Sequence, residues 1–363
     1  MAIFFFIIGL EIKREVTVGE LSNIKVAILP ILAAVGGMVF PALIYLNINA
    51  GTVGANGWGI PMATDIAFAI SAMILLGKRV PPALVTFLVA LAIVDDLGAV
   101  MVIALFYTEQ IHMLPLMLAG ASFLTLVVFN RFGIHMILPY FIVGLILWFF
   151  MFESGVHATI AGVIAALAIP SKPKISAVGF RKEAKRLLDE YDTYHIDSKH
   201  GMNERQKAIL LKLESNINAI GTPAARLERD LHLPVALIVI PLFAFANAGI
   251  AIDFSSIGTT IMEPVSIGIM AGLIFGKVIG IFGVAWLATK LKVATLPKDS
   301  TMSQIFGVAF LAGIGFTMSI FVAELAFMNN PELIFQAKVG ILSASLFAGF
   351  FGYIWLRFIA RSK

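Results

Sequence analysis

Long apolar runs, each close to the length of a membrane span and separated by short connections, recur along almost all of this 363-residue chain. An α-helix needs about 20 apolar residues to cross the hydrocarbon core of a bilayer. Apolar residues make up 60% of the chain and charged residues 13%, whereas soluble domains average roughly 45–50% and about 25%. A water-soluble fold could not bury so much apolar surface. The sequence therefore predicts an all-α polytopic membrane protein.

The positions of the apolar runs predict the spans. They lie near residues 28–49, 56–76, 82–107, 114–132, 134–150, 156–170, 233–249, 264–288, 305–327 and 334–359. A shorter run, Ala2 to Leu10, has about half the length of a span. It lacks the basic start and the small-residue cleavage site of a signal peptide, so we interpret it as the tail of a helix that begins further upstream.

One segment, residues 171–232, has a soluble composition. It holds 12 of the 26 Lys and Arg residues and 9 of the 22 Asp and Glu residues. Helical spacing predicts two short helices, over 181–190 and 204–216, and Thr222 followed by Pro223 predicts the start of the helix that leads into the next span. The predicted organisation is a membrane region at 1–170, a charged loop at 171–232 that acts as a spacer or a regulatory element, and a membrane region at 233–363.

Basic residues are confined to alternate connections, which predicts the orientation of the chain. The connections at 47–56, 107–113, 151–155, 250–263 and 327–333 contain no Lys or Arg. The other set carries Lys13, Arg14, Lys25, Lys78, Arg79, Arg131, the 171–232 loop, Lys290, Lys292, Lys298, Arg357, Arg361 and Lys363. By the positive-inside rule, this second set, with the loop and the C-terminus, is cytoplasmic. Lys338 is an exception near the outer face that snorkelling would accommodate.

Four charged residues fall near the middle of predicted spans: Asp65, Asp95, Asp96 and Lys277. Charges at this depth are costly and are functional hypotheses by default. Three carboxylates and one ammonium leave an excess of negative charge, which favours a cation site. Crowding and desolvation also favour the protonated form of carboxyl groups, so the same groups are suited to exchanging protons. Structural ion pairing between helices is the alternative, although it would leave two carboxylates without partners. The matching depth of Asp95 and Lys277 predicts a buried pair between these two residues.

Two predicted spans have Gly, Pro or polar residues at their midpoints, in GIPMATDIAF (59–68) and GIGFTMSIF (313–321). Overlaying 59–61 on 313–315 aligns the two strings, and each lies in the middle of a three-span group, 28–107 or 264–359. Paired interrupted spans predict an inverted-repeat transporter whose two broken helices cross at mid-membrane. Asp65 would offset the positive helix N-termini there and Lys277 the negative C-termini. Two closely packed, glycine-kinked helices are the alternative.

Seven strings, in order along nearly the whole chain, resemble those of NhaA-type sodium/proton antiporters. They are GLEIKRE (9–15), IPMATDIAFA (60–69), ALAIVDDLGA (90–99), SGVHATIAGV (154–163), IPLFAFANAG (240–249), GKVIGI (276–281) and GIGFTMSIF (313–321). This family is itself an example of the inverted-repeat architecture. The resemblance implies an electrogenic exchanger of the bacterial inner membrane that exports sodium or lithium in exchange for protons. It implies no cofactor, no enzymatic activity and no nucleic-acid partner.

The resemblance also assigns roles to residues of this chain. Asp95 and Asp96 would bind the ion and carry protons, Thr64 would join them in holding sodium, and Lys277 would be their charge partner. The helix breaks would be formed by Thr64, Asp65, Gly313 and Gly315, and the pH response would involve Glu11, Arg14, Glu15 and Glu228. The resemblance implies a homodimer in a lipid bilayer, although the first family helix, part of the second and the hairpin that contributes to dimer contacts have no counterpart here.

Two other functional classes use similar residues. An intramembrane aspartyl protease could use Asp65 with Asp95 or Asp96, but its usual GxGD context is absent and a mid-membrane lysine would disfavour a shared proton. A sodium-coupled symporter or a cation channel could use the same broken helices. A symporter would need a pocket for an organic substrate, whereas the residues here offer carboxylates.

Overall fold

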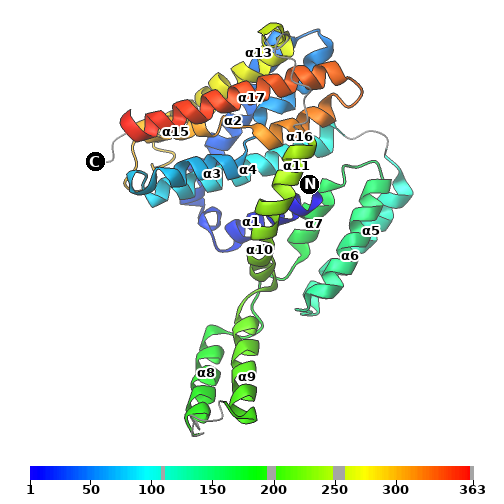
Figure 1. Ribbon diagram of the computed structural model, residues 1–363, viewed down its shortest axis with the longest axis vertical. Coiled ribbons are helices and arrows are strands. Elements are labelled where there is room, and N and C mark those ends of the chain that lie inside the picture. The colour runs from blue at the N-terminus through cyan, green and yellow to red at the C-terminus, as the bar shows by residue number, and fades with distance from the viewer. Residues whose placement is uncertain (108–110, 194–201, 248–257, 360–363) are drawn as a thin grey trace.

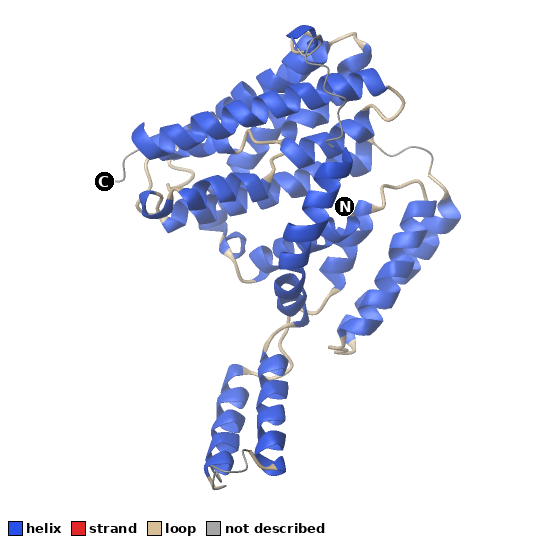
Figure 2. Cartoon of the chain, viewed as in Figure 1, coloured by secondary structure: helices blue, strands red, loops and turns tan. Residues whose placement is uncertain are grey.

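The computed structural model describes residues 1–107, 111–193, 202–247 and 258–359, and these residues form helices and connections with no strand among them (Figure 1 and Figure 2). Much of the predicted outer connection 250–263 and the last basic residues, Arg361 and Lys363, lie outside the described residues. In the described part, six helices are long and apolar enough to cross a membrane, or eight if each of two bent pairs counts as one span. The predicted all-α polytopic fold is confirmed.

Three of the six long spans are single helices, and three are continuous helices that include π-helical turns. The single helices are α2 (Ile24–Asn49), α4 (Pro82–Phe106) and α5 (Met113–Arg131). The continuous ones are α10 (Pro223–Pro234) with η4 (Val235–Val239) and α11 (Ile240–Asn247); α13 (Pro264–Ala271) with η5 (Gly272–Gly276), η6 (Val278–Gly283) and α14 (Val284–Lys290); and α17 (Pro331–Ile354) with η7 (Trp355–Ile359).

The two bent pairs are the predicted interrupted spans. The first joins η2 (Val53–Met62), a 3₁₀ helix, to α3 (Ile66–Leu75) at an angle of 41°. The second joins α15 (Met302–Leu311) to α16 (Phe316–Ala326) at 49°. Three shorter helices complete the bundle: α1 (Ala2–Thr17), α6 (Ile137–Glu153) and α7 (Thr159–Ala168). Single 3₁₀ turns, η1 (Glu20–Ser22) and η3 (Gly77–Arg79), lie in connections.

The span predicted near 233–249 begins earlier, at Pro223. The Thr222 side chain accepts a hydrogen bond from the Ala225 N–H at 3.1 Å, as the predicted cap requires. Hydrophobicity marks only where the apolar part of the helix begins. The same helix starts earlier in the chain, with a polar segment that Thr222 caps. The charged residues of this segment, including Glu228, are therefore carried on a spanning helix.

The charged loop contains the two predicted helices, α8 (Ala177–Asp192) and α9 (Glu204–Ile220). They form a hairpin that projects from the rest of the molecule beyond α10 (Figure 1). Ser176 caps α8, and Asn203 with Gln206 forms a capping box at the start of α9. Leu187 of α8 and Ile209 of α9 are buried.

Small residues let helices approach at backbone distance next to the predicted charges. A Cβ atom added to Gly36 of α2 would overlap the carbonyl oxygen of Gly280 in η6, and one added to Gly280 would overlap the Gly36 oxygen. Small residues at helix contacts are the usual means of close packing in membranes. Because α2 also packs against α4, it holds the helix that carries Lys277 beside the helix that carries Asp95 and Asp96.

Candidate functional site

The two bent pairs meet at their breaks, which lie at 63–65 and 312–315. The Asp65 N–H donates to the Ile314 carbonyl at 2.6 Å, and the Thr64 hydroxyl donates to the Ala312 carbonyl at 2.8 Å. In the other direction, the Ser319 hydroxyl donates to the Ile60 carbonyl at 2.9 Å. Backbone groups that each helix leaves unpaired at its break are thus satisfied by the other pair, which makes the interruption tolerable at this depth.

The overlay of Gly59 on Gly313 is wrong in register. Gly313 and Gly315 lie in the second break, as predicted, whereas Gly59 lies inside η2 and the first break comes later, at Thr64 and Asp65. The helix after the first break, α3, begins with an aspartate cap, whereas the helix after the second break, α16, begins at a glycine. Aligning the glycines of the two segments therefore misaligns the two breaks. Gly59 has another role: its N–H donates to the Tyr107 hydroxyl at 3.3 Å, and an added Cβ would meet that side chain.

Asp65 lies at the N-terminal ends of both distal half-helices. It is the N-cap of α3, where its carboxylate accepts from the Phe68 N–H at 3.4 Å. It also accepts from the backbone N–H of Thr317, in the first turn of α16, at 3.1 Å and from the Thr317 hydroxyl. The carboxylate therefore offsets the partial positive charge of two helix N-termini, as predicted for Asp65.

Asp95 and Lys277 form a buried ion pair, with the Lys277 Nζ 2.8 Å from a carboxylate oxygen of Asp95. Their exposed fractions are 1% and 0%. Lys277 was also expected to balance the negative end of a half-helix, but its described hydrogen bond is to Asp95. The π-helical segments η5 and η6 lie on either side of Lys277. Such segments are rare and often mark functional sites.

Asp96 follows Asp95 on α4 and is also 1% exposed. Adjacent helical residues project about 100° apart, so the two carboxylates face different surroundings. Asp96 lies within electrostatic reach of Asp95, Glu11, Asp65 and Lys277. In the described residues, the Oδ1 atoms of Asp95 and Asp96 are buried and have no hydrogen-bond partner. Buried polar atoms are nearly always paired, so two such oxygens on adjacent residues need an explanation.

A hard cation is a suitable partner for these oxygens, because carboxylate and hydroxyl oxygens are the ligands that such cations prefer. Thr64 lies beside the Asp95 carboxylate and is fully buried. Within the residues that the structure describes, no group of three or more His, Cys, Asp or Glu side chains is arranged to hold a metal ion. The oxygens at the crossing come instead from two carboxylates and neighbouring hydroxyls.

The four residues to which the resemblance assigns a pH response lie together, although Glu228 is far in sequence from Glu11, Arg14 and Glu15. Arg14 of α1 forms ion pairs with Glu228 of α10 and, at 3.2 Å, with Glu15. Glu11 lies within electrostatic reach of all three. The early start of α10 explains this cluster, because it places Glu228 on a rigid helix that packs against α1.

Sequence reasoning missed two features. Lys338, explained above by snorkelling, forms an ion pair with Glu324 of α16 at 2.7 Å. Two opposite charges near the same end of neighbouring spans were a sufficient indication of this pair. The hydroxyls of Thr317, Ser319 and Ser345 all bond to backbone or carboxylate groups at the crossing. Single hydroxyls are common in membrane helices, so nothing in the sequence distinguished these.

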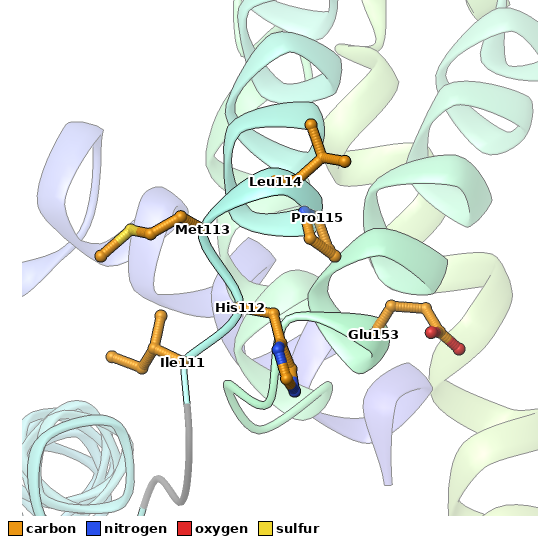
Figure 3. A pocket seen from close by; sticks show the side chains of 6 residues that line it. All are labelled: Ile111, His112, Met113, Leu114, Pro115 and Glu153. Carbon is orange, nitrogen blue, oxygen red and sulfur yellow. The ribbon is translucent and has the colours of Figure 1, made fainter.

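The pocket drawn in Figure 3 lies away from the crossing. It has a volume of about 520 Å³ and lies between the start of α5 and the end of α6, lined by Ile111, His112, Met113, Leu114, Pro115 and Glu153. None of the predicted site residues lines it. A second pocket, of about 270 Å³, is lined in part by residues of α4, the helix that carries the two adjacent carboxylates: Ala83, Thr86, Phe87 and Ala90.

Comparisons with known proteins agree on one family. Residues 1–356 match the profile of the family described as Na+/H+ antiporter 1. The Na(+)/H(+) antiporter NhaA of Sulfurimonas denitrificans is 69% identical over 362 residues, which cover 100% of this chain and 82% of that protein. The Na(+)/H(+) antiporter NhaA 1 of Saccharophagus degradans is 49% identical, and the NhaA of Dichelobacter nodosus 48%; the matches cover 100% and 99% of this chain and 78% of each relative.

Proposed function

The chain belongs to the Na+/H+ antiporter 1 family, and from this premise we propose that it exports sodium or lithium in exchange for protons by alternating access. It is a secondary transporter and not an enzyme. One observation carries the proposal for its site: among the residues that the structure describes, two adjacent buried carboxylates each have an oxygen without a hydrogen-bond partner, and one of the two is paired with a lysine.

In the proposed cycle, Asp95 and Asp96 hold either the metal ion or protons. Sodium is the cargo, bound by carboxylate oxygens together with the Thr64 hydroxyl. When protons occupy the carboxylates, the site loses its affinity for cations. Lys277 compensates the negative charge of Asp95 when this carboxylate is ionised. Binding of a proton or a sodium ion reduces that negative charge, so the attraction between Lys277 and Asp95 then weakens. The crossing of the breaks provides the fixed point about which the two sides open in turn.

Sodium transport is expected to move net charge. If two carboxylates release two protons for each sodium ion bound, one charge crosses per cycle. In reconstituted vesicles, a sodium gradient should therefore drive proton movement, and an imposed membrane potential should change its rate. A channel would pass sodium without moving protons, and a symporter would require an organic solute, so the same vesicles distinguish these alternatives. Exchange that is insensitive to the potential would contradict the stoichiometry.

Apparent sodium affinity is expected to weaken as the pH falls, because protons and sodium compete for the same oxygens. Where the protonated form predominates, mass action requires a decrease of about tenfold per pH unit for each competing proton. The measurement is sodium-dependent proton movement at a series of sodium concentrations between pH 6 and pH 9. A sodium affinity that is constant over this range would rule out competition.

We also propose that Glu11, Arg14, Glu15 and Glu228 adjust transport to pH. The contacts of Arg14 with Glu15 and Glu228, which tie α1 to α10, support this role. The distribution of basic residues supports a cytoplasmic location for this cluster, the α8–α9 hairpin and the C-terminus. The bacterial inner membrane is the proposed location, and a homodimer the proposed assembly.

A further inference from the structure

The first turn of α16 is capped by another helix. Its N-cap residue is Gly315, which has no side chain with which to accept hydrogen bonds. The first N–H groups of any helix lack intrahelical partners. Here the N–H groups of Gly315 and Phe316 both donate to the Ser345 hydroxyl oxygen, at 3.2 Å and 3.1 Å, and the next N–H, of Thr317, donates to Asp65. Three consecutive donors thus share one neutral acceptor and one carboxylate.

Ser345 occupies a special position on α17. It is buried, at 9% exposure. The helices α4 and α17 are the last members of the two inverted repeats, and both begin with a proline, Pro82 and Pro331. Ser345 follows Pro331 at the same sequence distance as Asp96 follows Pro82. At equivalent positions, one repeat therefore has a carboxylate and the other a hydroxyl that binds a helix N-terminus.

We propose that Ser345 is a positioning residue for cation binding, and this inference rests on the proposed antiport function. The hydroxyl accepts hydrogen bonds from the N–H groups of Gly315 and Phe316 at the positive end of α16. The Asp65 carboxylate therefore accepts from the N–H of Thr317 and not from these two groups. Asp65 in turn lies within electrostatic reach of Asp96. Ser345 acts through these groups and does not itself bind the ion.

The expected effect follows from the charge of a helix terminus. A helix N-terminus carries a partial positive charge of about half an elementary charge on its unpaired N–H groups. Without the Ser345 hydroxyl, the N–H groups of Gly315 and Phe316 either stay unpaired at the crossing or turn toward the Asp65 carboxylate. Both outcomes make the potential near Asp96 more positive, and a cation then binds less tightly.

The test compares three variants of the full chain in vesicles: Ser345→Ala, Ser345→Thr and Ser343→Ala. Ser343 lies on the same helix and has no described side-chain hydrogen bond, so it controls for the loss of a hydroxyl. Loss of a helix cap typically corresponds to a factor of about five in an equilibrium constant. Ser345→Ala should therefore raise the sodium KM about fivefold with a maximal rate within about twofold of the wild type. Ser345→Thr and Ser343→Ala should leave the KM nearly unchanged.

A purely structural role would give a different result. In that case Ser345→Ala would lower the unfolding temperature in detergent without changing the sodium KM of the folded protein, and the proposal would be overturned. It would equally be overturned if Ser345→Thr raised the KM as much as Ser345→Ala. If Ser345→Ala does not insert, Ser345→Cys, a weaker acceptor of similar size, should give an intermediate KM, and an unchanged KM would refute the proposal. Failure of the antiport function itself is distinguishable, because the wild-type protein would then show no sodium-driven proton movement.

Discussion

Replacing Asp96 with asparagine is expected to abolish sodium-dependent proton movement while leaving a folded, membrane-inserted protein. Asn and Asp have nearly the same shape, but the amide cannot carry a transported proton and has no negative charge to attract sodium. The carboxylate has no lysine or arginine ion-pair partner among the described residues, and its Oδ1 has no hydrogen-bond partner there. Removing its charge therefore strands no opposite charge, so the free energy of unfolding should not fall.

The measurement for Asp96→Asn is sodium-driven proton movement in vesicles, together with thermal unfolding in detergent. Glu153→Gln is a matched control, because it neutralises an exposed carboxylate outside the crossing; it should exchange like the wild type. Exchange at the wild-type rate in Asp96→Asn would refute the assignment of Asp96. Loss of folding in this variant would show instead that the Asp96 charge has a structural partner.

Breaking the Asp95–Lys277 pair is expected to destabilise the protein strongly. Removing one member of a buried ion pair leaves an uncompensated charge and costs roughly 3–5 kcal/mol. Asp95→Asn or Lys277→Gln alone should therefore lower the unfolding temperature substantially. The double variant leaves no charge stranded, so it should be more stable than either single variant. The interaction energy of this double-mutant cycle is the quantity that measures the pair.

Additive losses in the cycle would contradict the pair and would favour a Lys277 that only balances helix dipoles. A cycle on Glu183 and Arg186 of α8 provides the control. This ion pair is exposed to solvent, and exposed pairs contribute little to stability. Its variants should unfold at nearly the wild-type temperature, which would show that the effect at Asp95 comes from burial and not from the loss of a charge pair in general.

Eight of the ten predicted spans correspond to described helices or bent pairs long and apolar enough to cross a membrane, because apolar runs of that length have few alternative structures. The predicted spans 134–150 and 156–170 correspond to the shorter apolar helices α6 and α7. The sequence also placed Asp65, Asp95, Asp96 and Lys277 at one depth, since charges in apolar runs are rare enough to be noticed. Their matching depth also predicted that Lys277 pairs with Asp95, and the 2.8 Å contact confirms this pair.

Other features depended on contacts between distant segments. The true register of the breaks follows from the hydrogen bonds of Asp65 and Thr64 with the second pair, and these are not visible in the residue types. The Ser345 cap is likewise formed by a helix other than the one that it caps. The start of α10 was indicated by Thr222 and Pro223, but hydrophobicity placed the span later than the cap did.

The mutual bonding of the two breaks has a consequence for biogenesis. Thr64 and its acceptor Ala312 are 248 residues apart along the chain. During synthesis, the first bent pair therefore emerges long before the segment that will satisfy its open backbone groups. Unpaired backbone groups are not tolerated in contact with lipid. Until α15 and α16 are inserted, the first break must keep its polar groups in contact with water or with insertion machinery, and the crossing is among the last parts of the protein to assemble.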